Sequence, residues 1–467
     1  MTNPPNPLRD VEATRNLERR IDELPMSRHL WLLVLLLSLG TFFETYELAL
    51  TSLVPPGLMK AGIFAHAHGM FGLPDQAAFA AATFLGMFIG AMGFGRVADR
   101  VGRKRAFTGS ILLYTATTLL MALQHSAVGV DLARFAAGIG LGAEIVTVDA
   151  YLAEIAPAPY RGRVFAFAIF IQFLAVPIAS GLSLTLVPLE PFGIDGWRWV
   201  CFIGGVGGIL VLMARRRLPE SPRWLAQHGS LERAAQIVDA MEKRSGVQAK
   251  PLMHSSPGAV LVDVAPSSNT AASQNLFAPA WRSRVVMLTL ANVFSTIGFF
   301  GLGNWLPTLL AAQGHTIAKS LEFNFYISLC YPLCPLLFML FADKIERKWQ
   351  LAGATLASAL LGVVFGHQTQ SVAIVLLGLG VTVSNLLIAY SIHTYQAELF
   401  PSVIRAKAVG FVYSWGRLAT VFSSLLIGYL LQTGGTNAVF VFLAACFVAV
   451  SLLVAVLGPR TLNRTSM

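Results

Sequence analysis

Charged residues are scarce in this sequence of 467 residues. Asp, Glu, Lys and Arg make up only 12% of the chain, whereas a soluble domain contains about 25%. Hydrophobic residues make up 55%, and many apolar runs exceed the ~18 residues that a helix needs to cross a bilayer. This composition excludes a globular enzyme with a soluble core. It predicts an all-α membrane protein that crosses the bilayer many times.

Cysteine is also rare, and the usual signs of catalysis are missing. The sequence has four cysteines, all in apolar stretches, which favours buried small side chains. Cys330 and Cys334 have helical spacing, but no nearby His or acid completes a metal site. The sequence shows no nucleophile and base in a recognisable pair. We therefore expect neither an enzyme nor a bound metal.

Acidic residues are outnumbered by basic ones, and the formal net charge is +10. Such an excess can indicate a nucleic-acid partner, but here the cations are concentrated in short segments between apolar runs. That distribution is typical of the cytoplasmic loops of a membrane protein. We therefore expect no nucleic-acid partner. We expect a multi-pass protein of the inner (plasma) membrane with both termini in the cytoplasm.

The segment 95–105 is the most highly charged part of the apolar region and contains five basic residues and one acid. Because charge is costly in hydrocarbon, the segment is predicted to be a short loop at the membrane surface. The segment 98–104 is echoed by 342–348, and the pattern of 151–161 is echoed by 395–405, both at an offset of 244 positions (342 − 98 = 395 − 151 = 244). Two unrelated polar patterns at one offset indicate a tandem duplication, an arrangement found in secondary transporters.

The apolar runs predict two six-helix bundles joined by a cytoplasmic linker. The expected parts are an N-terminal cytoplasmic segment 1–28, a first bundle 29–217, a linker 218–282, a second bundle 283–458 and a tail 459–467. The linker should contain an amphipathic helix at 231–243 and a flexible stretch rich in Ser, Ala and Pro at 255–274. The twelve helices are expected at about 30–53, 76–98, 107–123, 131–157, 164–187, 197–213, 285–310, 323–341, 351–366, 372–399, 409–431 and 438–457.

Three motifs give the chain a family resemblance. Gly95 to Arg105 resembles the loop between helices 2 and 3 of the major facilitator superfamily, and the resemblance covers nearly the whole chain. The segments 134–142, 151–162 and 219–225 resemble the sugar-porter branch, and Pro-Glu-Ser-Pro-Arg-Trp-Leu at 219–225 is quite specific. The resemblance implies a twelve-helix transporter with two pseudo-repeated bundles and no cofactor other than the proton as coupling ion.

The sequence departs from sugar porters in the helix at 285–310. Sugar porters carry glutamines in helices 5 and 7 for sugar hydroxyls, but this helix has none and instead contains the aromatic segments 299–301 and 304–307. Together with Gly416-Arg417, this pattern is more similar to nicotinate (niacin) permeases and synaptic-vesicle-glycoprotein-like proteins. The segment Phe43-Glu44-Thr45-Tyr46-Glu47 is similar to the acidic motif of aromatic-acid/proton symporters, with Glu in place of their Asp.

Ionisable residues inside apolar helices are candidates for proton coupling. Glu47 aligns with the helix 1 acid of sugar porters, and Arg134 is its expected partner; a static pair that only joins the two helices is the alternative. Glu44, three residues earlier, and Glu144 are further candidates.

Arg417 is the charge expected to hold the substrate, because a guanidinium can hold a carboxylate through two hydrogen bonds. The alternatives are an ion pair with a neighbouring acid or a side chain that extends to the membrane surface. Aromatic and polar side chains of the central helices complete the candidate substrate site, although any single aromatic could instead face lipid. They are Tyr46, Gln172, Phe299, Phe300, Asn304, Trp305, Tyr326, Asn385, Tyr390, His393 and Trp415.

The repeated charges are predicted to form a cytoplasmic gate of ion pairs between helices. They are Asp99, Arg100, Arg103, Glu154 and Arg161, with Asp343, Arg347, Glu398 and Arg405. The sequence thus favours a proton-coupled importer of a small aromatic or heteroaromatic carboxylate, nicotinate first, acting as a monomer in the bilayer. A sugar or polyol symporter and a drug or organic-cation exporter are the alternatives. A non-transporting receptor on the same scaffold is less favoured because of the intact buried acids.

Overall fold

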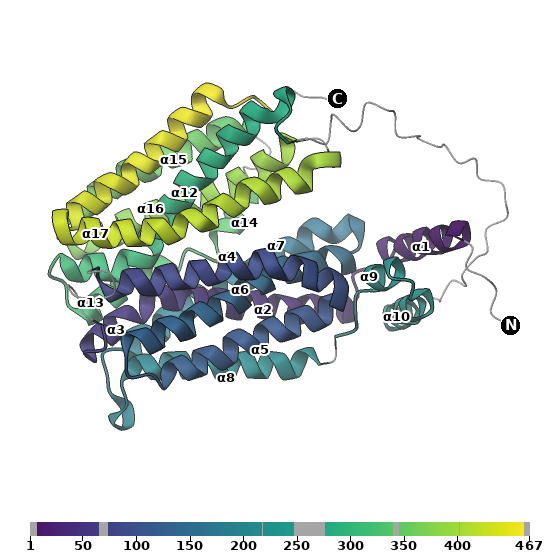
Figure 1. The fold of residues 1–467 in the computed structure, drawn as a ribbon, viewed down its shortest axis with the longest axis horizontal. Coiled ribbons are helices and arrows are strands. Elements are labelled where there is room, and N and C mark those ends of the chain that lie inside the picture. Colours follow the sequence, from purple (N-terminus) through teal and green to yellow (C-terminus); the bar gives the residue numbers. More distant parts are fainter. Residues whose placement is uncertain are drawn as a thin grey trace.

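The computed structural model describes residues 7–64, 73–216, 218–246, 276–339, 345–400 and 402–461. Within these ranges the chain is helical and contains no strand. Figure 1 shows two helical bundles lying side by side, one from each half of the chain. Short helices lie beyond both ends of the bundles, with α3 (Pro55–Lys60) at one end and α9 (Pro222–Gln227) at the other. These ends are called the α3 end and the α9 end below.

Six long helices form the first bundle. They are α2 (Arg28–Leu53), α4 (Asp75–Val101), α5 (Arg103–Ala122), α6 (Ala127–Ile155), α7 (Arg161–Leu186) and α8 (Gly196–Arg215). The segment 95–105 is therefore not a loop, contrary to the sequence prediction. Two helices run through it and meet at Gly102, whose φ of 102° favours glycine. A Cβ at Gly102 would lie 2.6 Å from a carboxylate oxygen of Glu220, so the tight junction also requires a residue without a side chain.

The second bundle contains two irregular helices. It consists of α12 (Pro279–Ala312), α13 (Ile317–Ser328), α14 (Cys334–Met339), α15 (Arg347–Gly366), α16 (Ser371–Glu398) and α17 (Ser402–Leu457). α13 and α14 replace one predicted span and are separated by a turn that contains Pro332. The predicted last two spans form α17, which bends sharply at Gly435 (φ 67°, ψ −168°). The break between α13 and α14 and the bend in α17 both fit a bundle of six membrane spans.

The hydropathy of the helices supports a twelve-span protein. In the part of the chain that the structure describes, nine helices are long and apolar enough to cross a membrane. That count excludes α5, whose first turn is basic, and the interrupted α13–α14 pair, and it treats the bent α17 as one helix. Counting α5 as one span, the α13–α14 pair as one span and α17 as two spans gives twelve spans, six in each bundle. The fold is thus that of an all-α polytopic membrane protein.

Glycines let α4 and α6 approach closely. A Cβ added at Gly86 or Gly90 of α4 would lie 2.2 or 2.1 Å from a backbone oxygen of α6, and one at Gly138 or Gly142 would meet α4 as closely. Contacts of this kind are typical of membrane helices, where small residues allow backbones to touch. The close approach also fixes where the polar side chains of α6 lie relative to α4.

Three short helices lie together at the α9 end: α1 (Pro7–Asp22), α9 and α10 (Leu231–Arg244). Leu17 and Ile21 of α1 are buried against Leu225 of α9 and Val238 of α10. The buried guanidinium of Arg20 lies 2.7 Å from Glu242 and 2.5 Å from Asp239. The hydrogen bond to Glu242 raises the pKa of Arg20 above its ordinary value. The predicted amphipathic helix at 231–243 is confirmed, whereas the stretch 255–274 lies outside the described residues.

Candidate functional site

A fully buried ion pair joins α2 to α6. The Glu47 and Arg134 side chains are only 1% and 0% exposed, and Arg134 Nη1 lies 3.1 Å from Glu47 Oε2. Arg134 also donates to the Thr51 and Thr83 hydroxyls at 2.9 and 3.1 Å, and Thr118 donates to Glu47 at 2.7 Å. Glu47 Oε1 accepts no hydrogen bond from any residue that the structure describes. The structure thus brings the predicted pair together and leaves one carboxylate oxygen available.

A second buried pair was not predicted. Arg215, the last residue of α8, lies with Nη1 3.2 Å from Glu144 Oε1, and both side chains are 1% exposed or less. Arg215 Nε also donates to the backbone oxygen of Leu36 at 2.7 Å, and Nη2 donates to that of Leu37. A Cβ at Gly40 would lie 1.9 Å from Arg215 Nη2, so only glycine leaves room for the guanidinium.

This second pair has a structural arrangement of its own. Arg215, although it ends α8, is a buried cation inside the bundle. Glu144 was expected as a proton carrier, yet its carboxylate is held by a guanidinium that is fixed to two carbonyls of α2. The arrangement is that of a structural tie between α2, α6 and α8.

Arg417 lies between the two bundles and has no acidic partner among the described residues. Its Nη2 donates to the Tyr413 hydroxyl at 2.9 Å, one turn earlier on α17. Its Nη1 lies 4.0 Å from the sulfur of Met87 on α4, in the other half. The guanidinium carbon lies 5.8 Å from the centre of the Phe300 ring on α12. The half-buried cation is therefore positioned by aromatic rings and a hydroxyl, with several N–H donors left over.

Aromatic rings surround Arg417 and continue across the interface between the halves. Phe300 contacts Phe84 of α4, with ring centroids 4.8 Å apart, and Phe299 at 5.1 Å. His393 of α16 lies 5.3 Å from the Tyr413 ring, and its Nδ1 is 3.2 Å from Gln396 Nε2. The structure therefore brings the predicted Arg417, Phe299, Phe300 and His393 into one region. The sequence analysis did not predict Phe84 as part of the site. Phe84 lies two residues before Gly86, one of the α4 glycines that approach α6.

A second aromatic cluster lies at the break between α13 and α14. Tyr331, in the turn between the two helices, contacts Phe173 of α7 with centroids 5.7 Å apart. Tyr390 of α16 contacts Phe338 of α14 at 6.2 Å, and Phe299 packs against the same cluster. Interrupted helices in transporters occur where backbone lines a cavity or substrate site. Tyr390 thus lies near the predicted site, together with three aromatics that the sequence analysis did not predict: Phe173, Tyr331 and Phe338.

Glu44 is a buried acid on the side of α2 toward Arg417. Its side chain makes no hydrogen bond or ion pair with any residue in the described ranges, although the residue is only 4% exposed. Arg417, Arg215, Glu144 and Asp149 are its electrostatic neighbours. Because an isolated buried carboxylate is costly, Glu44 needs either a proton or a nearby cation.

Several predicted substrate residues lie away from Arg417. Tyr46 donates its hydroxyl to the backbone oxygen of Val200 and packs under α8, inside the first bundle. Asn385 accepts from Ser358 at 2.7 Å between α15 and α16, inside the second bundle. Trp415 is 44% exposed and contacts Phe411, so it faces away from the layer that contains Arg417. The contacts of these three side chains are packing contacts, and none of them is with Arg417.

In the described part of the chain, the hydrogen-bond and ring contacts of Arg417 involve none of the remaining four predicted substrate residues. Asn304 accepts a hydrogen bond from Gln76 through its backbone oxygen at the α3 end, and Trp305 is buried in the adjoining core of the second bundle. Tyr326 is 44% exposed beside Phe325 on α13. Gln172 is half-buried on α7.

The predicted gate residues form two matching ion pairs. Arg103 Nε lies 3.2 Å from Glu154 Oε1 between α5 and α6, and Arg347 Nε lies 3.3 Å from Glu398 Oε1 between α15 and α16. The two pairs stand 244 positions apart (347 − 103 = 398 − 154 = 244), so the duplication extends to their geometry. Each pair joins helices of one bundle.

The other gate residues have different surroundings. Arg161 lies 3.6 Å from Asp22 of α1, which also pairs with Arg223 of α9 at 2.7 Å. Arg100 is exposed at the end of α4. Asp343 lies outside the described residues, as do the side chains of Asp99 and Arg405.

Hydrogen bonds join the two bundles near the α3 end. Gln76 of α4 donates to the Asn304 backbone oxygen at 3.2 Å and accepts from Thr308 at 2.6 Å. Asn324 of α13 donates to Ser180 of α7 at 3.1 Å. α4 and α17 pack against each other near this end and diverge toward the α9 end (Figure 1). The bundles are therefore more tightly joined at the α3 end.

The fold and these buried charges define a membrane carrier built from two repeated bundles. The family described as Sugar (and other) transporter matches residues 33–467. The chain belongs to this family, within the major facilitator superfamily. It is accordingly a transporter and not an enzyme.

Individual relatives support the same assignment. YyaJ of Bacillus subtilis (strain 168) is 31% identical over 450 residues, covering 96% of both chains. The niacin transporter NiaP of Acinetobacter baylyi is 25% identical and covers 96% of this chain and 98% of its own. The benzoate transport protein of the same species is 26% identical and covers 89% and 87%. A solved structure of the Escherichia coli xylose transporter XylE, 19% identical, covers 94% of this chain and all of its own with a TM-score of 0.74, which shows the shared fold.

Proposed function

We propose that this chain is a proton-coupled secondary transporter that imports a small aromatic or heteroaromatic carboxylate, with nicotinate as the first choice. The observation that carries the proposal is Arg417, a half-buried cation with no acidic partner among the described residues. A guanidinium in this position can bind a carboxylate through two hydrogen bonds. Phe300 and Phe84 offer ring faces and edges beside it, which suit a planar aromatic substrate.

The names of two relatives agree with this substrate class. They are a niacin transporter and a benzoate transport protein, and niacin and benzoate are small ring carboxylates. The xylose transporter shares the fold, but the groups that contact the Arg417 guanidinium are the Tyr413 hydroxyl, the Met87 sulfur and the Phe300 ring rather than amides. This composition favours an anion over a sugar.

Glu47 is proposed as the coupling acid. Its partner Arg134 is held by Thr51 and Thr83, so the cation stays in place when the carboxylate takes a proton. Glu47 Oε1 is available to receive that proton. Glu44 is the second candidate, because it is buried without a partner and lies toward Arg417. Protonation of Glu47 would replace the buried ion pair with a neutral acid beside the Arg134 cation. This change would alter the free energies of the outward-facing and inward-facing conformations by different amounts.

Transport by alternating access follows from the two-bundle architecture. Contacts such as Gln76 with Thr308 would close the site from one side, and their release would let the bundles rock. The Arg103–Glu154 and Arg347–Glu398 pairs would keep each bundle rigid at its α9 end during this movement. We place that end and both termini in the cytoplasm of the inner membrane, and we expect a monomer.

Uptake of labelled nicotinate into proteoliposomes tests the proposal. The purified full chain is reconstituted with and without an inward proton gradient, and empty liposomes serve as the control. Gradient-dependent accumulation is expected, with competition by benzoate and none by xylose. If the folded protein accumulates xylose or an organic cation such as tetraphenylphosphonium but not nicotinate, the carboxylate role of Arg417 is wrong and the transporter class stands.

A further inference from the structure

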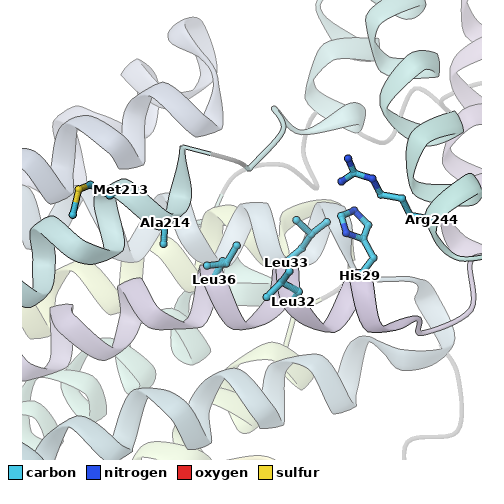
Figure 2. A pocket seen from close by; sticks show the side chains of 7 residues that line it. All are labelled: His29, Leu32, Leu33, Leu36, Met213, Ala214 and Arg244. Atoms are coloured by element: carbon cyan, nitrogen blue, oxygen red, sulfur yellow. The ribbon is translucent and has the colours of Figure 1, made fainter.

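A pocket of about 680 Å³ opens at the α9 end, where α10 meets the first turns of α2 and the last turn of α8. Figure 2 shows His29 and Arg244 together at one end of the pocket and Met213 and Ala214 at the other, with leucines of α2 between them. The pocket lies outside both bundles and does not belong to the substrate region around Arg417. Its two ends differ in chemistry, one being cationic and the other apolar.

The position of α10 beside α2 is fixed by polar contacts. Ser27, the N-cap of α2, and Ser245, just after α10, have hydroxyl oxygens 2.9 Å apart. On the other side of α10, Glu242 is tied to Arg20 of α1 by two hydrogen bonds, at 2.9 and 2.7 Å. Arg244 is therefore held beside His29 by a fixed arrangement of three helices, and the pocket is a built feature of the fold.

The Arg244 guanidinium and the His29 imidazole have no protein partner in the described part of the chain. The side chains of His29 and Arg244 make no hydrogen bond or ion pair with any residue in the described ranges. Arg244 is the electrostatic neighbour of His29, and the two repel each other when both are charged. Two adjacent donors without an acid are expected where an anion from outside the protein binds.

The apolar part of the pocket faces the membrane. Leu32 and Met213 are 52% and 48% exposed, and both belong to helices that are apolar and long enough to cross a bilayer. They lie at the ends of these helices, where hydrocarbon gives way to headgroups. A soluble anion would satisfy the cations but would leave the apolar wall unused, whereas an amphiphile with an anionic head fits both parts.

We propose that this pocket binds an anionic phospholipid of the bilayer leaflet on the α9 side. Its phosphate lies between His29 and Arg244, and the first part of an acyl chain lies along Leu32, Leu36 and Met213. Arg28, an exposed cation next to His29 in the chain, adds to the attraction for an anionic headgroup. The site joins α10 to α2 and α8 through a lipid, so that the short helices at the α9 end are anchored to the membrane surface as well as to the bundle.

Native mass spectrometry of the detergent-purified full chain tests this proposal, with phosphatidylglycerol as the probe and phosphatidylcholine as the zwitterionic comparison. Arg244→Gln is expected to weaken phosphatidylglycerol binding roughly five-fold, the effect of one cation near an anionic headgroup. Lys243→Gln is the matched control, because it removes the same charge from the same helix without lining the pocket, and it should change binding by less than about two-fold. Ala214→Phe should also weaken binding, because it fills the apolar end without changing any charge.

The outcomes separate the lipid from other anions. Equal effects of Arg244→Gln and Lys243→Gln would overturn the proposal in favour of general surface attraction. Complete competition by inorganic phosphate, with Ala214→Phe unchanged, would overturn it in favour of a soluble anion. Selective loss in Arg244→Gln and Ala214→Phe, in protein that elutes as the same species as wild type, supports it. None of these readouts depends on nicotinate, so the result is independent of the proposed substrate.

Discussion

Replacement of Arg417 by Ala gives the sharpest test of how this transporter recognises its substrate. The guanidinium has five N–H donors, of which one Nη2 proton is engaged by the Tyr413 hydroxyl at 2.9 Å. The remaining donors can make two hydrogen bonds to a carboxylate. A hydrogen bond to a charged group contributes about 1.5 to 3 kcal/mol. Because Arg417 is only half-buried, the lower value applies to each bond.

Two such bonds give about 3 kcal/mol, so Arg417→Ala is expected to weaken nicotinate binding roughly 100-fold. Arg417→Lys keeps the charge but loses the planar pair of donors, and about 10-fold is expected. Nicotinamide, which has the same ring without the negative charge, should lose far less in either variant. The informative quantity is therefore the ratio of the nicotinate and nicotinamide dissociation constants.

The assay is competition against labelled nicotinate, or isothermal titration calorimetry, on protein whose folding is checked by circular dichroism and gel filtration. A ratio that falls from wild type through Lys to Ala supports direct carboxylate binding at Arg417. An Ala variant that keeps the wild-type ratio would refute the reasoning, because the carboxylate would then bind elsewhere. Parallel losses for both ligands would show that Arg417 shapes the site without contacting the carboxylate.

Three other changes address coupling and packing. Glu47→Gln should abolish proton-driven accumulation yet preserve exchange of substrate between the two sides of proteoliposomes, because Gln resembles the protonated acid; normal accumulation would exclude Glu47 as the coupling residue. Glu144→Gln should destabilise the fold by about 3 to 5 kcal/mol through an unpaired buried cation, and adding Arg215→Met should recover part of that loss in thermal unfolding; purely additive losses would argue against the tie. Gly90→Leu should lower the unfolding temperature, because a Cβ there lies 2.1 Å from a backbone oxygen of α6, whereas Gly93→Leu meets nothing within 4 Å and should not.

The internal repeat made part of the molecule predictable. The offset of 244 positions predicts matching charges in both halves, and the structure contains the pairs Arg103–Glu154 and Arg347–Glu398 with distances of 3.2 and 3.3 Å. The buried pair of Glu47 and Arg134 was likewise expected, because an acid and a base inside apolar helices need each other. These predictions rest on the free-energy cost of placing a charge in hydrocarbon. That cost depends on whether the residue lies within an apolar run and little on the direction in which its side chain points.

The sequence did not predict how each helix is rotated about its axis, and therefore which side chains face the substrate region. Neighbouring residues of a helix point about 100° apart, so Tyr46 and Glu47 cannot face the same partner, and Trp415 faces away from Arg417. The aromatics predicted for the substrate site therefore include residues that pack inside a bundle or face away from Arg417. Arg215 was missed for a related reason, since it begins a run of arginines that resembles a surface cluster. Only the space at Gly40 and the carbonyls of α2 show that it turns inward.

The distribution of charge between the halves explains why one substrate anion could drive a conformational change. In the first bundle, Arg134 and Arg215 are each neutralised by an acid of the same bundle, so they move as part of a rigid body. Near the interface, by contrast, Glu44 on the first bundle and Arg417 on the second have no ion-pair partner among the described residues. Their attraction acts across the interface. A carboxylate bound to Arg417 would replace Glu44 as its counterion, and Glu44 would then need a proton to remain buried. Substrate and proton would enter together because neither charge is stable alone at this interface.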